Sequence, residues 1–168
     1  EDVVDKLVTG LEGMARAREV QVIRGKAVFE SSEIVRIEGK SEIARVKYQN
    51  AILASGSSPI SLPGVEFKKG GRIMSSAQAL DLEEIPDTLL VVGAGYIGLE
   101  MATIYHAFNT EISIVELTDD FMPGMDNDLI TAYKKEGKEI FKDIFLKSKV
   151  TKIENSGKRL KVELEDKN

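Results

Sequence analysis

The chain has 168 residues, a formal net charge of −5 and no cysteine. A domain takes about 100–200 residues, so this length allows one domain or little more, and the acidic balance disfavours nucleic acid as a partner. The absence of thiols excludes disulfides and cysteine metal sites within these residues, and a single histidine disfavours a zinc site. With neither a long apolar run nor a secretory signal, we expect no membrane span and a cytoplasmic location.

The first third of the chain has the pattern of a helix followed by short strands. Residues 2–18 place apolar side chains at helical spacing, which predicts an amphipathic helix with a buried stripe of Val3, Val4, Leu7, Leu11 and Met14. Segments rich in branched residues then predict strands at 20–23, 33–37, 43–48 and 51–53. Prolines and glycines between residues 55 and 71 break regular structure, so we expect a linker and a domain boundary there.

A strand, a glycine-rich turn and a helix follow the linker in direct succession. Residues 88–92 are a continuous apolar run typical of a buried parallel strand, and residues 96–108 keep apolar positions at helical spacing. Gly93, Gly95 and Gly98 span the junction of this strand and helix in G-x-G-x-x-G spacing. In dinucleotide-binding folds the first glycine permits a tight turn, the second lets the backbone approach a pyrophosphate, and the third lets helix and strand pack closely. The free N–H groups of the helix start would face the phosphate.

The residues after this helix strengthen the prediction of a dinucleotide-binding turn. A second strand at 112–115 leads into Glu116, eighteen residues after Gly98, near the roughly 20-residue offset at which an acidic side chain binds the adenosine ribose. A carboxylate accepts both ribose hydroxyls but would repel a 2′-phosphate by about 4 kcal/mol at roughly 4 Å and an effective dielectric of ~20. Residues 117–120 contain no arginine. The sequence therefore predicts NAD(H) rather than NADP(H).

A turn, a third helix and a hairpin complete the predicted pattern. Residues 121–125 contain proline and glycine and precede a helix, capped by Asp126 or Asn127, that runs to about residue 141. Apolar and polar residues alternate in segments 144–153 and 159–164, which flank a hairpin turn. Such a hairpin is antiparallel, so we expect a mixed sheet rather than a purely parallel one. The expected class is α/β: a Rossmann-like NAD-binding domain with a parallel sheet plus an antiparallel hairpin.

The motifs resemble those of the pyridine nucleotide-disulfide oxidoreductases, and most of all the members that oxidise dihydrolipoamide. One part of the resemblance is GAGYIGLE at 93–100 with IVEL at 114–117. Another is AILASGSSP at 51–59, which is similar to the family's short segment that closes the FAD domain beside the flavin nucleotide. The segments RIMSSAQALDLEEIP at 72–86 and PGMDND at 123–128 extend the similarity over nearly the whole chain.

The resemblance implies a domain organisation in which the chain is a central fragment. Residues 1–56 would be the C-terminal part of an FAD-binding domain, 57–75 a linker, and 76–168 an NAD-binding domain that lacks its final strand. The family's FAD-binding glycine turn, redox cysteine pair and dimer domain with a catalytic histidine have no counterpart in this sequence. We therefore expect no catalytic residue in the chain, and no disulfide chemistry from it in isolation.

The activity that the resemblance implies belongs to the parent protein. Such a parent oxidises dihydrolipoamide through its cysteine pair, passes the electrons to FAD and transfers a hydride to NAD. It is expected to be a homodimer associated with 2-oxo acid dehydrogenase complexes.

By the same resemblance, two groups of residues bind the cofactors. On the NAD side the three glycines hold the pyrophosphate and Glu116 binds the adenosine ribose. Ile97 would pack beside the pyrophosphate and Val150 would lie near the adenine. Tyr96 would cover the nicotinamide pocket, and Glu100 would approach the nicotinamide end. On the FAD side, backbone contacts are expected from Ala54, Ser55, Gly56 and Ala27, the last at a position where relatives often have glycine.

Alternatives stay open at the level of residues and of function. Tyr96 can be a packing residue at a helix start, and Glu100 a carboxylate favoured by the positive end of the helix dipole. The parent can be a sibling flavoenzyme such as an NADH oxidase or a mercuric reductase, which shares the NAD turn. It can also be a non-catalytic nucleotide-binding or assembly module that retains the fold without redox chemistry.

Overall fold

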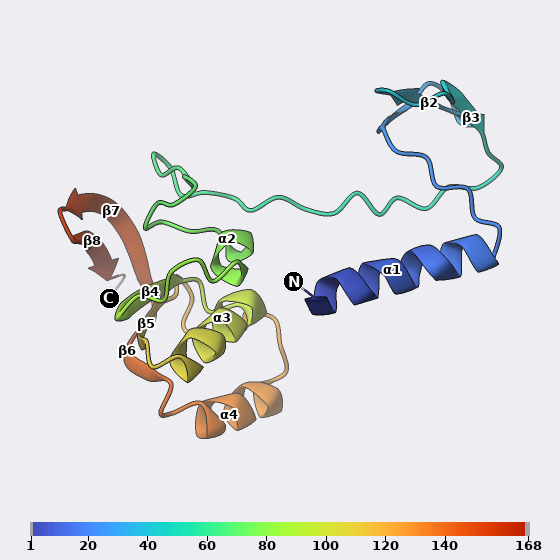
Figure 1. Cartoon of the computed structure of the whole chain (residues 1–168). Helices are drawn as coiled ribbons and strands as arrows, with labels where there is room; N and C mark the ends of the chain where they lie inside the picture. The colour runs from blue at the N-terminus through green and yellow to red at the C-terminus, as the bar shows by residue number, and fades with distance from the viewer. Residues whose placement is uncertain (1, 167–168) are drawn as a thin grey trace. The chain divides into compact units, whose positions relative to one another are not determined.

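The computed structural model describes residues 2–166, and these divide into two compact units between Gly56 and Ser57 (Figure 1). The elements of the first unit are α1 (Asp2–Ala17), β1 (Lys26–Phe29), β2 (Ile34–Glu38) and β3 (Arg45–Lys47). Those of the second are α2 (Ser76–Leu80), β4 (Thr88–Val92), α3 (Tyr96–Ala107), β5 (Glu111–Val115), α4 (Asn127–Glu136), β6 (Phe141–Phe145), β7 (Ser148–Ser156) and β8 (Arg159–Asp166). None of the helices in residues 2–166 is long and apolar enough to cross a membrane.

Helix α1 forms where the helical spacing predicts it, but its apolar stripe is not buried. The five stripe residues are 49–70% exposed, and α1 has no buried residue. The prediction of the helix is confirmed and the prediction of its burial is wrong. The pattern determines which face of a helix is apolar, whereas burial also needs an element that covers this face, and the strands of the first unit do not.

The strands of the first unit form a small antiparallel sheet in the order β1-β2-β3. The strands predicted at 33–37 and 43–48 are confirmed as β2 and β3, with shifted ends, while β1 was not predicted. The strands predicted at 20–23 and 51–53 are wrong, since both segments have no regular structure. A branched segment becomes a strand only when a neighbour takes up its backbone hydrogen bonds, and neither segment pairs with another strand in the described part of the chain.

A parallel three-stranded sheet in the order β4-β5-β6 is the centre of the second unit. Strand β4 has the predicted bounds, and α3 and β5 match their predictions to within one residue at each end. The long apolar run of β4 and the buried Ile112, Ile114 and Val115 of β5 fit strands that are covered by a crossover helix.

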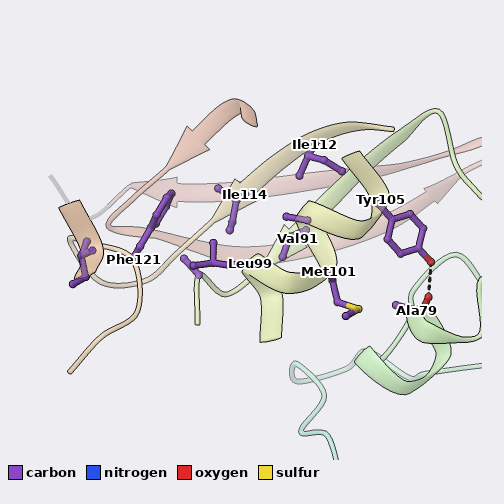
Figure 2. Close-up of a cluster of buried hydrophobic side chains, with 11 residues drawn as sticks. Ala79, Val91, Leu99, Met101, Tyr105, Ile112, Ile114 and Phe121 are labelled. Carbon is purple, nitrogen blue, oxygen red and sulfur yellow. Dashed lines mark hydrogen bonds between the residues drawn. The ribbon is translucent and has the colours of Figure 1, made fainter. Parts of the chain in front are cut away.

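The core of the second unit lies between this sheet and the helices. Helix α3 contributes Leu99, Met101 and Tyr105 to a cluster that also contains Val91, Ile112 and Ile114 of the sheet, and Met101 points toward Ala79 of α2 (Figure 2). The hydroxyl of the fully buried Tyr105 donates to the carbonyl oxygen of Ala79 in α2 at 2.9 Å. Phe121 and Ile130 belong to the same cluster, so the loop after β5 and helix α4 pack into the same core. These contacts hold the end of β4 and the start of α3 in place.

The C-terminal part of the chain corrects two predictions. Helix α4 ends at Glu136, not near residue 141, and Gly137 is its C-cap, a position at which glycine is common. The predicted strand at 144–153 is two strands, β6 and β7, which are separated at Lys147, where φ is 51°. An alternating pattern does not reveal such a break, which depends on backbone conformation.

The hairpin β7–β8 is confirmed, with Gly157 at a φ of 69° in its turn. It forms a sheet of its own, so the prediction of one mixed sheet is wrong. The α/β class, with a parallel sheet plus an antiparallel hairpin, is confirmed.

Candidate cofactor-binding site

The predicted site residues of the second unit gather at the carboxyl ends of β4 and β5. Gly93 follows β4 and Glu116 follows β5, and these strands are parallel neighbours with Val92 opposite Val115. The N–H of Gly93 donates to the carbonyl oxygen of Val115 at 2.8 Å, which continues the ladder into the turn. In open α/β sheets, ligands bind outside the carboxyl ends of the strands.

The three glycines of the turn have different structural roles. Gly93 has a φ of 102°, a conformation that favours glycine. A Cβ on Gly98 would lie 2.2 Å from the backbone oxygen of Gly93 and 3.1 Å from Cγ1 of Val91, so only glycine lets α3 pack this closely. A Cβ on Gly95 would meet no atom within 4 Å, and its φ of −74° is open to any residue. The protein therefore does not itself require glycine at position 95, and the space beside it is open to a ligand.

The start of α3 leaves backbone donors free at this edge. Gly95 is its N-cap and makes no side-chain capping hydrogen bond, whereas α2 has a complete capping box between Ser75 and Gln78. In the part of the chain that the structure describes, no acceptor meets the N–H groups of residues 95–98. Free N–H groups and the positive end of a helix dipole together favour an anion at this point.

The segment after β5 holds Ala94, the residue between the first two glycines, from both sides. The N–H of Ala94 donates to Oε2 of Glu116 at 2.7 Å, and its carbonyl oxygen accepts from the N–H of Met122 at 2.8 Å. Ala94 is fully buried. The Glu116 carboxylate is thus joined directly to the glycine turn, although 22 residues separate it from Ala94.

Glu116 is a buried carboxylate with several hydrogen-bond donors. The residue is 8% exposed, and its Oε1 accepts from the N–H of Thr118 at 2.8 Å and from Oγ1 of Thr118 at 2.9 Å. Burial acts to raise the pKa of Glu116, but the hydrogen bonds from Ala94 and Thr118 together outweigh it and lower the pKa below its ordinary value. Glu116 is therefore an anion at neutral pH.

The lowered pKa of Glu116 predicts a pH dependence of stability. Because the pKa is lower in the folded than in the unfolded chain, Glu116 contributes stability that is present above its ordinary pKa of 4.5 and is lost as the pH falls through the folded value. We expect the unfolding free energy to fall more steeply below pH 4.5 for the wild type than for Glu116→Gln. Urea denaturation between neutral and acidic pH measures both slopes, and equal slopes would contradict the lowered pKa.

The other predicted NAD-side residues lie around the same turn. Tyr96 and Ile97 are 66% and 45% exposed, and Glu100 is exposed one helical turn further along α3. Val150 is half-buried in β7, a strand that begins beside Glu116, where the N–H of Ser148 donates to the Glu116 carbonyl oxygen at 2.9 Å. The large apolar side chains of Tyr96 and Ile97 are thus uncovered beside the free N–H groups, as residues that contact a ligand would be.

The predicted FAD-side residues are not gathered in this way. Ala27 is exposed in β1 opposite Ile37, while Ala54, Ser55 and Gly56 are exposed in a segment without regular structure. Among the hydrogen bonds of the described residues, none involves residues 54–56. The described residues fit a nucleotide at the glycine turn, and they provide no comparable arrangement for a flavin.

Three residues that hold the site together were not predicted from the sequence. Ala94, Thr118 and Met122 act through backbone groups or through a short hydroxyl, which carry almost no sequence signal. The only available signal was a threonine two residues after the acid, because Ser and Thr hydroxyls bond to nearby groups in such turns.

A depression of about 380 Å³ lies at the opposite, amino ends of β5 and β6. Its lining includes His106, Glu111 and Lys142, of which the last two form an ion pair at 2.6 Å. Parallel strands place these residues at the far edge of the sheet from the glycine turn, so the single histidine of the chain does not belong to the candidate site.

Comparisons with known proteins agree on one family. The profile of the family described as Pyridine nucleotide-disulphide oxidoreductase matches residues 2–168. Dihydrolipoyl dehydrogenase of Vibrio parahaemolyticus is 40% identical over 167 residues, which is 99% of this chain and 35% of the relative. Dihydrolipoyl dehydrogenase of Haemophilus influenzae is 41% identical over 168 residues, with the same two coverages. The chain spans about a third of the length of these curated relatives.

Two solved structures share the fold at lower identity. LpdA from Mycobacterium tuberculosis superposes with a TM-score of 0.75 at 21% identity, over 97% of this chain and 38% of that one. The HOCl-induced flavoprotein disulfide reductase RclA from Escherichia coli does so with a TM-score of 0.72 at 22% identity, over 95% and 37%. At such identities the likeness shows the fold alone.

Proposed function

The chain belongs to the pyridine nucleotide-disulphide oxidoreductase family, and we propose that its second unit binds NAD(H) as part of a dihydrolipoyl dehydrogenase. The observation that carries this proposal is the link between Glu116 and the glycine turn. A buried carboxylate at the end of β5 accepts from the N–H of Ala94 at 2.7 Å, directly beside a helix start whose own N–H groups have no acceptor among the described residues. The carboxylate can accept hydrogen bonds from ribose hydroxyls, and the free N–H groups of the helix start can donate to a pyrophosphate.

The same arrangement favours NAD(H) over NADP(H). Glu116 is held as an anion, since its hydrogen bonds lower its pKa, and an anion at this position repels a 2′-phosphate. Residues 117–120 offer no arginine that would compensate. Gly93, Gly95 and Gly98 would lie along the pyrophosphate, with Ile97 beside it. Val150 would contact the adenine, Tyr96 would cover the nicotinamide pocket, and Glu100 would approach the nicotinamide end.

The bound nicotinamide would supply the hydride-accepting group of the parent reaction, in which dihydrolipoamide is oxidised and the electrons pass through FAD. The chain's own residues would bind and orient the dinucleotide, and we assign no catalytic residue among them. On family resemblance alone, we propose FAD contacts from Ala27, Ala54, Ser55 and Gly56. On the same basis we propose a cytoplasmic homodimer associated with 2-oxo acid dehydrogenase complexes.

Sequence identity favours this parent over a sibling flavoenzyme. The two curated dihydrolipoyl dehydrogenases are 40% and 41% identical to the chain over nearly its whole length. A mercuric reductase, an NADH oxidase or a non-catalytic module has no observation of its own in its favour.

Glu116→Ala tests the proposed function. Loss of a charge-assisted hydrogen bond to the ribose costs about 2 kcal/mol, so we expect Kd for NADH to rise roughly thirtyfold. Fluorescence titration measures Kd. Glu111→Ala is the matched control, because it removes the same charge from the other end of β5, where Glu111 pairs with Lys142 on the surface. Equal affinity in Glu116→Ala and wild type would contradict the proposed role of Glu116.

A further inference from the structure

We propose that Thr118 is a positioning residue that fixes the carboxylate of Glu116 so that Oε2 is the oxygen presented to the ribose. This inference rests on the proposed function. The two carboxylate oxygens have different surroundings: Oε1 accepts from both the N–H and the hydroxyl of Thr118, at 2.8 and 2.9 Å. Oε2 accepts from the N–H of Ala94 at 2.7 Å, and the N–H of Leu117 also acts on this carboxylate.

The two oxygens of Glu116 differ in how many of their acceptor positions are occupied. A carboxylate oxygen has about two lone-pair positions, roughly four for the whole group. Thr118 occupies both positions of Oε1, whereas the Ala94 N–H occupies one position of Oε2. Oε1 is therefore the more fully occupied oxygen, and the acceptor capacity left for a ribose hydroxyl lies on Oε2, which is already bonded to the glycine turn. A ribose hydroxyl that donates there would lie next to the helix start at which the pyrophosphate is expected.

The Thr118 hydroxyl has a second acceptor in reach, the carbonyl oxygen of Asp120 at 3.0 Å. A hydroxyl has one proton, and a hydrogen bond to an ionised acceptor is roughly twice as strong as one between neutral groups. The proton is therefore directed at Glu116. The backbone of Thr118 is itself anchored, because its carbonyl oxygen accepts from the N–H of Lys147 at 2.8 Å.

Without the hydroxyl, the carboxylate would keep one donor on each oxygen and lose the distinction between them. The last side-chain torsion of glutamate is broad, so the group could then turn away from the position that receives the ribose. Orienting groups of this kind act by pre-organisation: they lower the cost of binding without touching the ligand.

A double-mutant cycle on the full 168-residue chain tests the proposal, with Kd for NADH as the measured quantity. A loss about as large as one ordinary net hydrogen bond predicts that Thr118→Val weakens NADH binding about fivefold to tenfold. Thr118→Ser, which keeps the hydroxyl, should stay within about twofold of wild type by the same reasoning. In the Glu116→Ala background, Thr118→Val should cause no further loss, because a residue that acts only through Glu116 has nothing left to position.

Three outcomes would overturn the proposal: an unchanged Kd in Thr118→Val, an equal loss in both backgrounds, or a loss that Thr118→Ser shares. The side chain of Thr118 is exposed, so these variants are expected to stay folded, and circular dichroism checks this. If Thr118→Val is unfolded, Thr118→Ala takes its place in the cycle under the same criteria. Failure of Glu116→Ala to weaken binding would count against the proposed function, whereas failure of Thr118→Val alone overturns only this inference.

Discussion

Gly98→Ala is expected to lower the unfolding free energy of the second unit by about 3 kcal/mol, at the upper end of typical overpacking costs. The added Cβ would lie 2.2 Å from the backbone oxygen of Gly93 and 3.1 Å from Val91 Cγ1. The first of these atoms is backbone, so no side chain can move aside to relieve the clash. Either α3 must move away from β4 or the turn must open, and in both cases the core around Val91 and Leu99 loses contacts.

Urea denaturation followed by circular dichroism measures this loss. Because an opened turn also separates Ala94 from Glu116, NADH binding should fall together with stability in Gly98→Ala. If the variant instead unfolds with the wild-type free energy, α3 does not approach the turn as closely as the structure places it.

Gly95→Ala is expected to have the opposite profile, with a large loss of binding and almost no loss of stability. Its Cβ would meet no protein atom within 4 Å, and the backbone at φ −74° and ψ 170° accommodates alanine. We therefore expect the unfolding free energy to stay within about 0.5 kcal/mol of wild type. A pyrophosphate that approaches the helix start would meet the new methyl group, which by the cost of overpacking, about 2 kcal/mol, predicts a roughly thirtyfold rise in Kd for NADH.

The two glycine variants are controls for each other, since both add one methyl group within the same turn. Fluorescence titration with NADH and urea denaturation, applied to both, separate packing from ligand approach. If Gly95→Ala binds NADH with the wild-type affinity, the pyrophosphate does not lie against residue 95. A stability loss as large as that of Gly98→Ala would show that the space beside Gly95 is filled by the protein.

The central part of the fold could be predicted because its signals are local. The apolar run of β4, the glycine spacing and the helical pattern of α3 each depend on residues close in sequence, and all three occur in the structure as predicted. The structure likewise places Glu116 beside the turn, since parallel neighbouring strands bring their carboxyl ends to one edge.

The errors concern features that depend on distant residues. The apolar face of α1 was predicted to be buried, although a pattern cannot say what covers it. Segments 20–23 and 51–53 have the composition of strands but pair with no strand among the described residues. Thr118 and Met122, which hold Glu116 and Ala94 in place, were missed because backbone donors and a single hydroxyl leave no periodic trace in a sequence.

Titration of the unaltered chain with NADH and with NADPH, under identical buffer conditions, tests the central claim most directly. We expect saturable NADH binding and NADPH binding that is weaker by about two to three decades at low salt, because Glu116 would repel a 2′-phosphate by up to about 4 kcal/mol. Equal or tighter binding of NADPH, or no binding of either nucleotide by a chain that circular dichroism shows to be folded, would contradict it.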